Sequence, residues 1–202
     1  MVPERLRPLL LVVAGPAGSG KTTLSERLVA TEPGFERVIT ATTRPMRPGE
    51  TNGVHYHFLT EAQFDESLAR GEFIEWARVH GRFRYGTLRR AVLDRLAAGV
   101  NLVINIDVQG VRSFRAAAKV DPLLRQALVT VFVMPESLDQ LRERLRGRRQ
   151  DSDAEIERRM QTAESEMREA VNFDHVIPTR TRDEDFAALL KIWEAARRSP
   201  PA

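Results

Sequence analysis

The residues best suited to chemistry in this sequence form one glycine-rich stretch that ends in a cation and a hydroxyl. It reads Gly15-Pro16-Ala17-Gly18-Ser19-Gly20-Lys21-Thr22 and matches the spacing G-x-x-x-x-G-K-S/T of phosphate-binding loops. In such loops the glycines let backbone N–H groups approach the anion, the lysine reaches the β- and γ-phosphates, and the hydroxyl ligates Mg²⁺. Only three lysines occur among the 31 Lys and Arg residues, so Lys21 is not a background cation. The stretch predicts a nucleotide-binding site with Thr22 as the metal ligand.

The elements on either side of this stretch are those that a phosphate-binding loop needs. Residues Leu9–Ala14 before it are continuously apolar and rich in branched side chains, which is typical of a buried parallel strand. Leu24 and Leu28 after it are four residues apart, as on one face of a helix. A strand, a glycine loop and a helix in this order direct backbone N–H groups and the positive end of the helix at a phosphate.

The rest of the chain alternates predicted strands with predicted helices. Apolar or alternating runs predict strands at 38–42, 54–59, 73–79, 102–106, 129–133 and 175–177. Capping boxes, apolar spacing and glycine stops predict helices at 60–71, 86–99 and 137–147, from 152 onward, and around 186–193. This order predicts an α/β fold in which a parallel sheet core is flanked by helices.

Two stretches interrupt this order, so the single predicted domain, 1–202, carries two insertions. Residues 38–97 contain short alternating strands and predict an inserted subdomain of mixed α+β structure. Residues 141–165 include the arginine-dense turn 146–151 and predict a short lid over the site. The predicted core then consists of 1–37, 98–140 and 166–202.

The overall composition excludes several classes of function. The net charge is only +3, and the pI of 9.8 reflects the high pKa of arginine, so the sequence predicts no nucleic-acid partner. The chain has no cysteine, which excludes a disulfide framework and fits a reducing compartment. No apolar run approaches the about 18 residues that a membrane span needs. We expect a cytoplasmic protein without a membrane partner.

Several motifs, in order along the chain, resemble those of guanylate kinases. They are Thr42–Glu50 with Gly53–Phe58, Gly71–Trp76, Tyr85–Thr87, Ile106–Gly110 and the arginine-rich turn from Arg146. The resemblance covers about residues 9–175 at nearly the spacing of the family. It implies transfer of the γ-phosphoryl group of ATP to GMP, giving ADP and GDP in purine nucleotide metabolism. It also implies that ATP binds at the loop Gly15–Thr22 and at the following Thr23, with Mg²⁺ as the accompanying cofactor.

The resemblance assigns the GMP site mainly to the predicted insertion. It places Arg44, Arg47, Tyr56 and Tyr85 on the GMP phosphate, and Thr40, Glu75 and Thr87 at the base. The residue types agree, because arginine forks match phosphate oxygens and one carboxylate can accept both the N1–H and the N2 amino group of guanine. Adenine offers no such pair of donors, so Glu75 is predicted to select the base.

Asp107 and the lid arginines have alternatives that the sequence leaves open. Asp107 follows the apolar run 102–106, which is the position of an acid that supports Mg²⁺ through water. The resemblance instead places Asp107 against GMP. The resemblance also implies that Arg148 and Arg159 close over the phosphates and are catalytic, together with Lys21 and Arg47. The neighbouring Arg146, Arg149 and Arg158 are alternatives for this role.

Four departures from the family pattern bear on details of the site. Ala17 replaces a serine, Asn105 replaces an acid, the segment 81–86 is one residue longer than usual, and Thr179-Arg180 replaces Asn-Asp near the adenine. The last departure leaves the base preference for the donor nucleotide open.

Two other functions stay open at this point. A different small-molecule kinase with the same core would act on another nucleotide or a phosphorylated sugar, against which Glu75 argues. A related interaction module would bind without catalysis, but such modules lose the phosphate-binding loop that Lys21 and Thr22 preserve here.

His55 and His57 share a predicted strand face, yet two ligands without a third make a poor metal site. The sequence makes no prediction of the oligomeric state.

Overall fold

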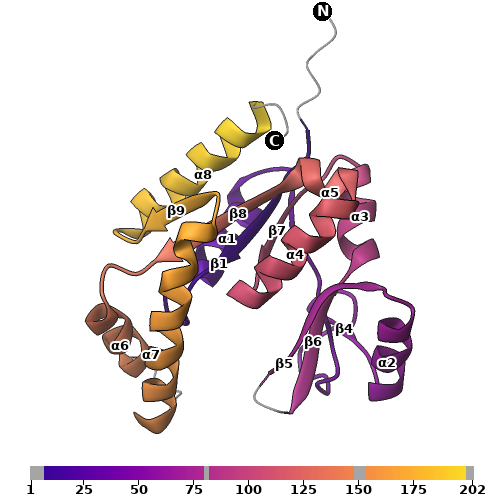
Figure 1. Ribbon diagram of the computed structural model, residues 1–202, viewed down its shortest axis with the longest axis horizontal. Helices are drawn as coiled ribbons and strands as arrows, with labels where there is room; N and C mark the ends of the chain where they lie inside the picture. The colour runs from indigo at the N-terminus through magenta and orange to yellow at the C-terminus, as the bar shows by residue number, and fades with distance from the viewer. Residues whose placement is uncertain (1–6, 80–81, 148–152, 199–202) are drawn as a thin grey trace, which may run out of the picture.

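The core of the protein is a parallel sheet built from the apolar runs of the sequence. The computed structural model describes residues 7–79, 82–147 and 153–198. The five strands of this sheet lie in the order β2-β7-β1-β8-β9 (Figure 1). Their bounds are Phe35–Arg37 for β2, Asn101–Asn105 for β7, Leu10–Ala14 for β1, Leu128–Met134 for β8 and His175–Pro178 for β9. β1 is central, because Leu10 pairs with Leu102 on one side and with Leu128 on the other.

Helices cover both faces of this sheet because β1 is apolar on both faces. Successive side chains of a strand point to opposite faces. Leu10, Val12 and Ala14 pack with α3 (Arg89–Ala97), α4 (Val108–Val120) and α5 (Pro122–Ala127). Leu9, Leu11 and Val13 pack with α1 (Lys21–Thr31) and α8 (Arg182–Arg198). The predicted α/β fold with a helix-flanked parallel sheet is confirmed.

A second, mixed sheet is formed by residues that lie between β2 and α3 in the chain. Its order is β4-β3-β6-β5, with β4 at His57–Phe58, β3 at Ala41–Thr42, β6 at Phe83–Leu88 and β5 at Phe73–Val79. Phe64 of α2 (Glu61–Ala69) packs on this sheet against Phe73 and Leu88. The capping box predicted at Thr60 is present, because its hydroxyl accepts from the Gln63 N–H and the Gln63 side chain accepts from the Thr60 N–H.

Two helices, α6 (Leu138–Gly147) and α7 (Asp153–Arg168), form a third and smaller core, and α7 leads into the 3₁₀ helix η1 (Glu169–Asn172). The members of this core are Leu141, Leu145, Ile156, Met160 and Ala163. At the start of α6 the predicted capping box is only half formed: Ser137 Oγ accepts from the Gln140 N–H, but the Gln140 side chain donates to Glu136. The other predicted capping box begins at Ser152, outside the described residues.

The mixed sheet and the α6–α7 pair lie at the same end of the parallel sheet, on opposite sides of it (Figure 1). This is the end at which the parallel strands finish, since β1 runs into Gly15 and β7 is followed by Asp107. Open parallel sheets bind their ligands outside the carboxyl ends of their strands. Among the described helices, none is long and apolar enough to cross a membrane.

Three predicted elements differ from the structure, and all lie between residues 35 and 88. The predicted strand 38–42 is reduced to Ala41–Thr42, because the chain leaves the parallel sheet after Arg37 and joins the mixed sheet at Ala41. The predicted strand 54–59 is reduced to His57–Phe58, because the N–H groups of Val54 and His55 turn back to the Thr51 carbonyl. The predicted helix 86–99 begins only at Arg89, because Gly86 and Thr87 pair with β5. The helices α4 and α5 and the strand β2 were not predicted.

Candidate active site

The phosphate-binding loop after β1 depends on glycines with left-handed backbone conformations. The φ angle is +139° at Gly15, +92° at Gly18 and +103° at Gly20, a region that other residues rarely adopt. A Cβ atom at Gly15 would also lie 2.4 Å from the carbonyl oxygen of Val133. Gly20 is the N-cap of α1, and no described side chain caps the helix there. The first N–H groups of α1 therefore point, with the positive end of the helix dipole, to where an anion would bind.

Lys21 and two threonines complete this loop. The Lys21 Nζ donates to the carbonyl oxygens of Gly15 at 2.6 Å and of Pro16 at 2.8 Å, so the cation lies over the loop itself. Thr22 and Thr23 are exposed in the first turn of α1. The structure thus brings together the glycine N–H groups, the cation and the hydroxyls that the sequence predicts for a nucleoside triphosphate.

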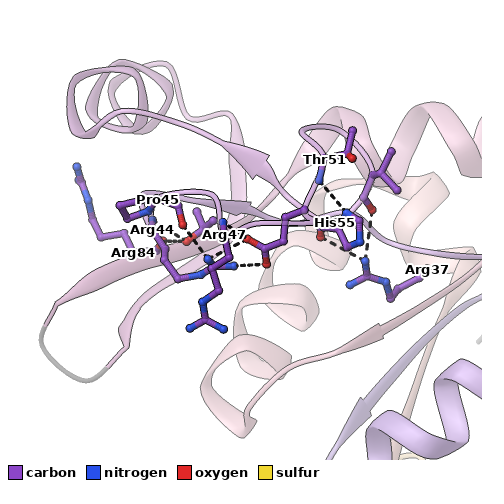
Figure 2. Close-up of polar contacts among 10 residues, drawn as sticks. Arg37, Arg44, Pro45, Arg47, Thr51, His55 and Arg84 are labelled. Carbon is purple, nitrogen blue, oxygen red and sulfur yellow. Dashed lines mark hydrogen bonds and ion pairs between the residues drawn. The ribbon is translucent and has the colours of Figure 1, made fainter.

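Three of the residues predicted for the GMP phosphate lie together beside the mixed sheet. Tyr85 pairs with Thr42 across β6 and β3, and its ring lies edge-on to that of Tyr56 with 5.8 Å between centroids. Arg44 follows β3, and its Cζ atom lies 5.5 Å from the Tyr56 ring centroid. Arg47 is exposed in the same loop, and Figure 2 shows its guanidinium directed away from that of Arg44.

The position of Tyr85 follows from a regular register between β6 and the Glu75–Val79 part of β5. Cα partners continue without a shift from Glu75 opposite Thr87 to Val79 opposite Phe83. The extra residue of the segment 81–86 therefore does not displace Tyr85 within its strand, although Gly81 itself lies outside the described residues.

Glu75, the carboxylate predicted to select the base, is held by Thr87, another predicted residue. Thr87 is fully buried, and its Oγ1 donates to Glu75 Oε1 at 2.5 Å. Burial raises the pKa of Glu75, the Thr87 hydrogen bond lowers it, and the charge of Asp107 raises it. A half-buried carboxylate with a fixed orientation can accept two adjacent donors from a planar ring. Thr40, also half-buried, lies next to this sheet, and its carbonyl oxygen accepts from the His57 N–H at 2.9 Å.

Asp107 caps α4 and faces carboxylates on two other elements. Its Oδ1 accepts from the Gly110 N–H at 2.8 Å, which satisfies a backbone donor at the start of the helix. The side chain is exposed, and its charge raises the pKa of both Glu75 and Glu166. Asp107 is therefore close enough to interact with both Glu75, the predicted base-selecting carboxylate, and Glu166, which itself interacts with Lys21.

The α6–α7 pair packs directly on the phosphate-binding loop. Ala17 packs against the α6–α7 core, so the alanine that replaces the usual serine makes an apolar contact. A Cβ atom at Gly18 would lie 3.1 Å from Leu141 Cδ1. A cavity of about 450 Å³ adjoins this contact and is lined by Ala17, Glu155, Arg158, Arg159, Thr162 and Glu166.

Two of the predicted lid arginines, Arg158 and Arg159, border this cavity, whereas the alternative Arg146 is exposed in the last turn of α6 and does not line it. Glu155 forms ion pairs with Arg158 at 2.5 Å and with Arg159 at 3.3 Å. Arg159 and its alternative Arg158 are therefore both within reach of the loop that Ala17 belongs to. Arg148 and its alternative Arg149 lie outside the described residues.

Glu166 of α7 belongs to this site and was missed by the sequence analysis. It is half-buried, and burial raises its pKa to about 7, with Lys21 lowering it and Asp107 raising it. The carboxyl group thus interacts with the cation of the phosphate-binding loop. The one signal in the sequence is its spacing, because Glu166 follows Ala163 of the buried stripe of α7 by three residues.

Glu166 should make the stability of the protein depend on pH in a defined direction. Its pKa is raised in the folded state, so above about pH 7 the folded protein holds a desolvated charge that the unfolded chain hydrates. We expect Glu166→Gln to raise the melting temperature by a few degrees at pH 8. The two melting curves should converge as the pH falls from about 7 to below 4.5, the ordinary pKa of the group. Thermal unfolding followed by circular dichroism measures this; a less stable variant at pH 8 would contradict it.

A second cavity, of about 610 Å³, adjoins the phosphate-binding loop at Gly18, Ser19 and Gly20 and the start of α1. Four arginines line it: Arg27, Arg144, Arg180 and Arg182. Arg180, one of the departures from the family pattern, is held by a bond from its N–H to Asp185 Oδ1 at 2.7 Å. A cationic wall of this kind suits a nucleoside triphosphate. Arg27, Arg144 and Arg182 escaped the sequence analysis because they come from three separate helices.

The remaining departures and histidines have local partners. Asn105, in place of an acid, accepts from Ser25 Oγ at 2.7 Å. His55 Nδ1 accepts from the Thr51 N–H, and burial lowers the pKa of His57. Within the described ranges, no three His, Asp or Glu residues are grouped so as to hold a metal ion by themselves.

Known proteins resemble this chain over almost its whole length. A sequence model of the family described as guanylate kinase matches residues 7–196. The chain is 46% identical to the guanylate kinase of Dechloromonas aromatica over 168 residues, which are 83% of this chain and 79% of that protein. It is 46% identical to the guanylate kinase of Anaeromyxobacter dehalogenans over 190 residues, 94% of this chain and 81% of that one. The crystal structure of guanylate kinase from Anaplasma phagocytophilum has a TM-score of 0.72 and 25% identity, covering 97% of this chain and 89% of its own.

Proposed function

This chain belongs to the guanylate kinase family, and from that membership we propose how its residues share the transfer of a phosphoryl group from ATP to GMP. The chain is a guanylate kinase, and its products are ADP and GDP. The observation that carries the assignment of roles is the Glu75–Thr87 pair, a half-buried and oriented carboxylate on the sheet that also carries Tyr85. Such a carboxylate recognises guanine by its two adjacent donors.

The donor half of the site is the phosphate-binding loop. We assign the ATP phosphates to Gly15–Thr23, with the Lys21 ammonium moving from the loop carbonyls to the β- and γ-phosphates. The exposed hydroxyl of Thr22 and the exposed carboxylate of Asp107 are hard oxygen donors, which suit Mg²⁺. Thr22 would hold the ion directly, and Asp107 would support it through water or contact GMP. When bound, Mg²⁺ neutralises charge that develops on the transferred group.

The acceptor half of the site lies beside the mixed sheet. We assign the GMP phosphate to Arg44, Arg47, Tyr56 and Tyr85, and the base to Glu75, Thr87 and Thr40. The clustering of Arg44, Tyr56 and Tyr85 supports this assignment. Residues 38–97 then act as the GMP-binding part of the enzyme.

The lid supplies cations to the transferred phosphoryl group. We assign this role to Arg159 and Arg148 within residues 141–165, together with Lys21 and Arg47. Charge stabilisation and exclusion of water are the main needs of phosphoryl transfer. The cavity that Arg159 shares with Ala17 of the loop supports its role. We place the enzyme in the cytoplasm, consistent with a chain that lacks cysteine, and propose no nucleic-acid or membrane partner.

A coupled assay of ADP release tests the assignment of substrates. ATP with GMP should give turnover that exceeds that with AMP, CMP or UMP by on the order of a hundredfold or more in kcat/KM. Equal turnover with another monophosphate would favour a different small-molecule kinase. Binding of GMP without any ADP release would favour an interaction module.

A further inference from the structure

Glu50 ties together the two arginines of the GMP-phosphate loop. Its Oε1 accepts from Arg44 Nη2 at 2.6 Å, and its Oε2 accepts from Arg44 Nη1 at 3.0 Å. The same Oε2 accepts from the backbone N–H of Arg47 at 2.7 Å. Figure 2 labels Arg44 and Arg47, which lie close together in this loop. One carboxylate therefore sets the side chain of Arg44 and the backbone of Arg47.

This ion pair is unlike the exposed pairs elsewhere on the protein. The side chains are only 8% exposed for Arg44 and 17% for Glu50, whereas those of the Arg95–Glu36 pair are 45% and 47% exposed. The bonds from Arg44 and from the Arg47 N–H lower the pKa of Glu50 to about 2, so the carboxylate is ionised at every physiological pH. Its partners raise the pKa of Arg44 further above its usual value. The rings of Tyr56 and Phe58 lie 5.5 and 5.6 Å from the guanidinium carbon, which limits its movement.

A count of the N–H donors of Arg44 shows which of them a phosphate can use. A guanidinium has five N–H donors in a planar arrangement. The two on Nη1 are used by Glu50 and by the Pro45 carbonyl at 2.7 Å, and one on Nη2 is used by Glu50. The Nε–H and the second Nη2–H form a second fork on another edge of the same plane. The Tyr85 hydroxyl is also hydrogen-bonded to this guanidinium, so a phosphate at the second fork would bind together with that hydroxyl.

We propose that Glu50 is a positioning residue for the phosphate of GMP, an inference that rests on the proposed function. Glu50 occupies the Nη1/Nη2 edge of Arg44 and thereby presents the Nε/Nη2 edge to two phosphate oxygens, beside the Tyr85 hydroxyl. By holding the Arg47 N–H it also sets where the second arginine leaves the loop. Without the carboxylate, Arg44 could offer either edge and the loop could change shape, so fewer molecules would be ready to bind the phosphate. The role concerns the phosphate and not the base, since Glu75 lies on β5.

The decisive comparison is between GMP and guanosine, which differ only in the phosphate. In Glu50→Gln we expect the KM and the dissociation constant for GMP to rise between about ten- and a hundredfold, the range for lost hydrogen bonds to a charged group. The inhibition constant of guanosine as a competitor of GMP should change less than about twofold, because the base site is intact. The KM for ATP and the kcat at saturating GMP should stay within a few-fold of the parent. Titration calorimetry and steady-state kinetics give all five values.

Two further variants make the outcome unambiguous. Glu61→Gln is the matched control, because Glu61 also pairs with a buried arginine of this part of the chain, Arg84, and should leave GMP binding unchanged. Glu50→Asp keeps the charge but is shorter, and should give an intermediate loss that is again confined to GMP. It replaces Glu50→Gln as the test if that variant does not fold.

The possible results separate this inference from the proposed function. Equal weakening of GMP and guanosine would mean that Glu50 only maintains the fold, and unchanged or tighter GMP binding would mean that it does not prepare Arg44. Either result overturns the inference while leaving a guanylate kinase. An unmodified protein that releases no ADP with GMP would instead remove the proposed function.

Discussion

Lys21→Ala should lower kcat with ATP and GMP by on the order of a hundredfold or more. Lys21 is the cation of the phosphate-binding loop, and its ammonium already lies over the loop at 2.6 and 2.8 Å from two carbonyl oxygens. Alanine removes the positive charge next to the β- and γ-phosphates, where negative charge develops during transfer. No backbone group can supply that positive charge. The effect should fall on kcat more than on the KM for GMP, because the acceptor site is on another element.

The fold should survive this change, since Lys21 lies in the first turn of α1 and is not a member of any hydrophobic core. Circular dichroism of the variant should match that of the parent. Lys191→Ala, at an exposed position of α8, is the matched control and should leave kcat within about twofold. Turnover of Lys21→Ala within a few-fold of the parent would show that the loop does not serve catalysis.

Glu75→Gln should lower kcat/KM for GMP by on the order of a hundredfold while hardly changing the affinity for ATP. The amide keeps the shape of the side chain but turns one acceptor oxygen into an NH₂ donor. That donor would face a donor of guanine in a half-buried site, and an unmet polar group there costs roughly 1–3 kcal/mol, more where a charge is lost. Discrimination against AMP should shrink too, because it depends on the same pair of hydrogen bonds.

The measurement is kcat/KM for GMP and for AMP in parent and variant. Glu72→Gln is the matched control, since Glu72 lies just before β5 and pairs with the exposed Arg70. It should leave both values unchanged. A GMP to AMP ratio that is the same in Glu75→Gln as in the parent would mean that another residue selects the base.

The core of the fold could be predicted because its signals are local. Leu9–Ala14, the glycine loop and the Leu24–Leu28 spacing identify β1 and α1 without reference to any distant residue. The mixed sheet could not be predicted in the same way. β3 and β4 are two residues long each, and Ala41 is in a strand only because Gly86 and His57 pair with it. Gly86 and Thr87 resemble a helix start by local rules, but their pairing with Trp76 and Glu75 of β5 overrides these rules.

The site residues likewise differ in whether the local sequence or only the tertiary structure reveals them. The sequence motifs contain Glu75, Thr87, Arg44 and Tyr85, and these residue types indicate the chemistry of the site. The structure brings the four residues together. Glu50 stands in such a motif too, but its role becomes visible only when its carboxylate is seen against Arg44. Arg144 carries no local signal, and Glu166 only its spacing from the buried stripe of α7. They reach the phosphate-binding loop because α6 and α7 pack on Ala17, which is a tertiary contact.

The first strand of the chain, β1, can take its place in the sheet only after both neighbouring strands have been synthesised. Leu10 pairs with Leu102 and Leu128, so β1 stays unpaired on the growing chain until β7 and then β8 have been synthesised. At synthesis rates of about 5–20 residues per second, this wait lasts on the order of ten seconds. During it, an apolar strand with two open edges is exposed to wrong pairing and aggregation. Parallel pairing over such sequence separations also makes refolding slow. Production of the active enzyme should therefore respond to temperature, expression rate and chaperone supply.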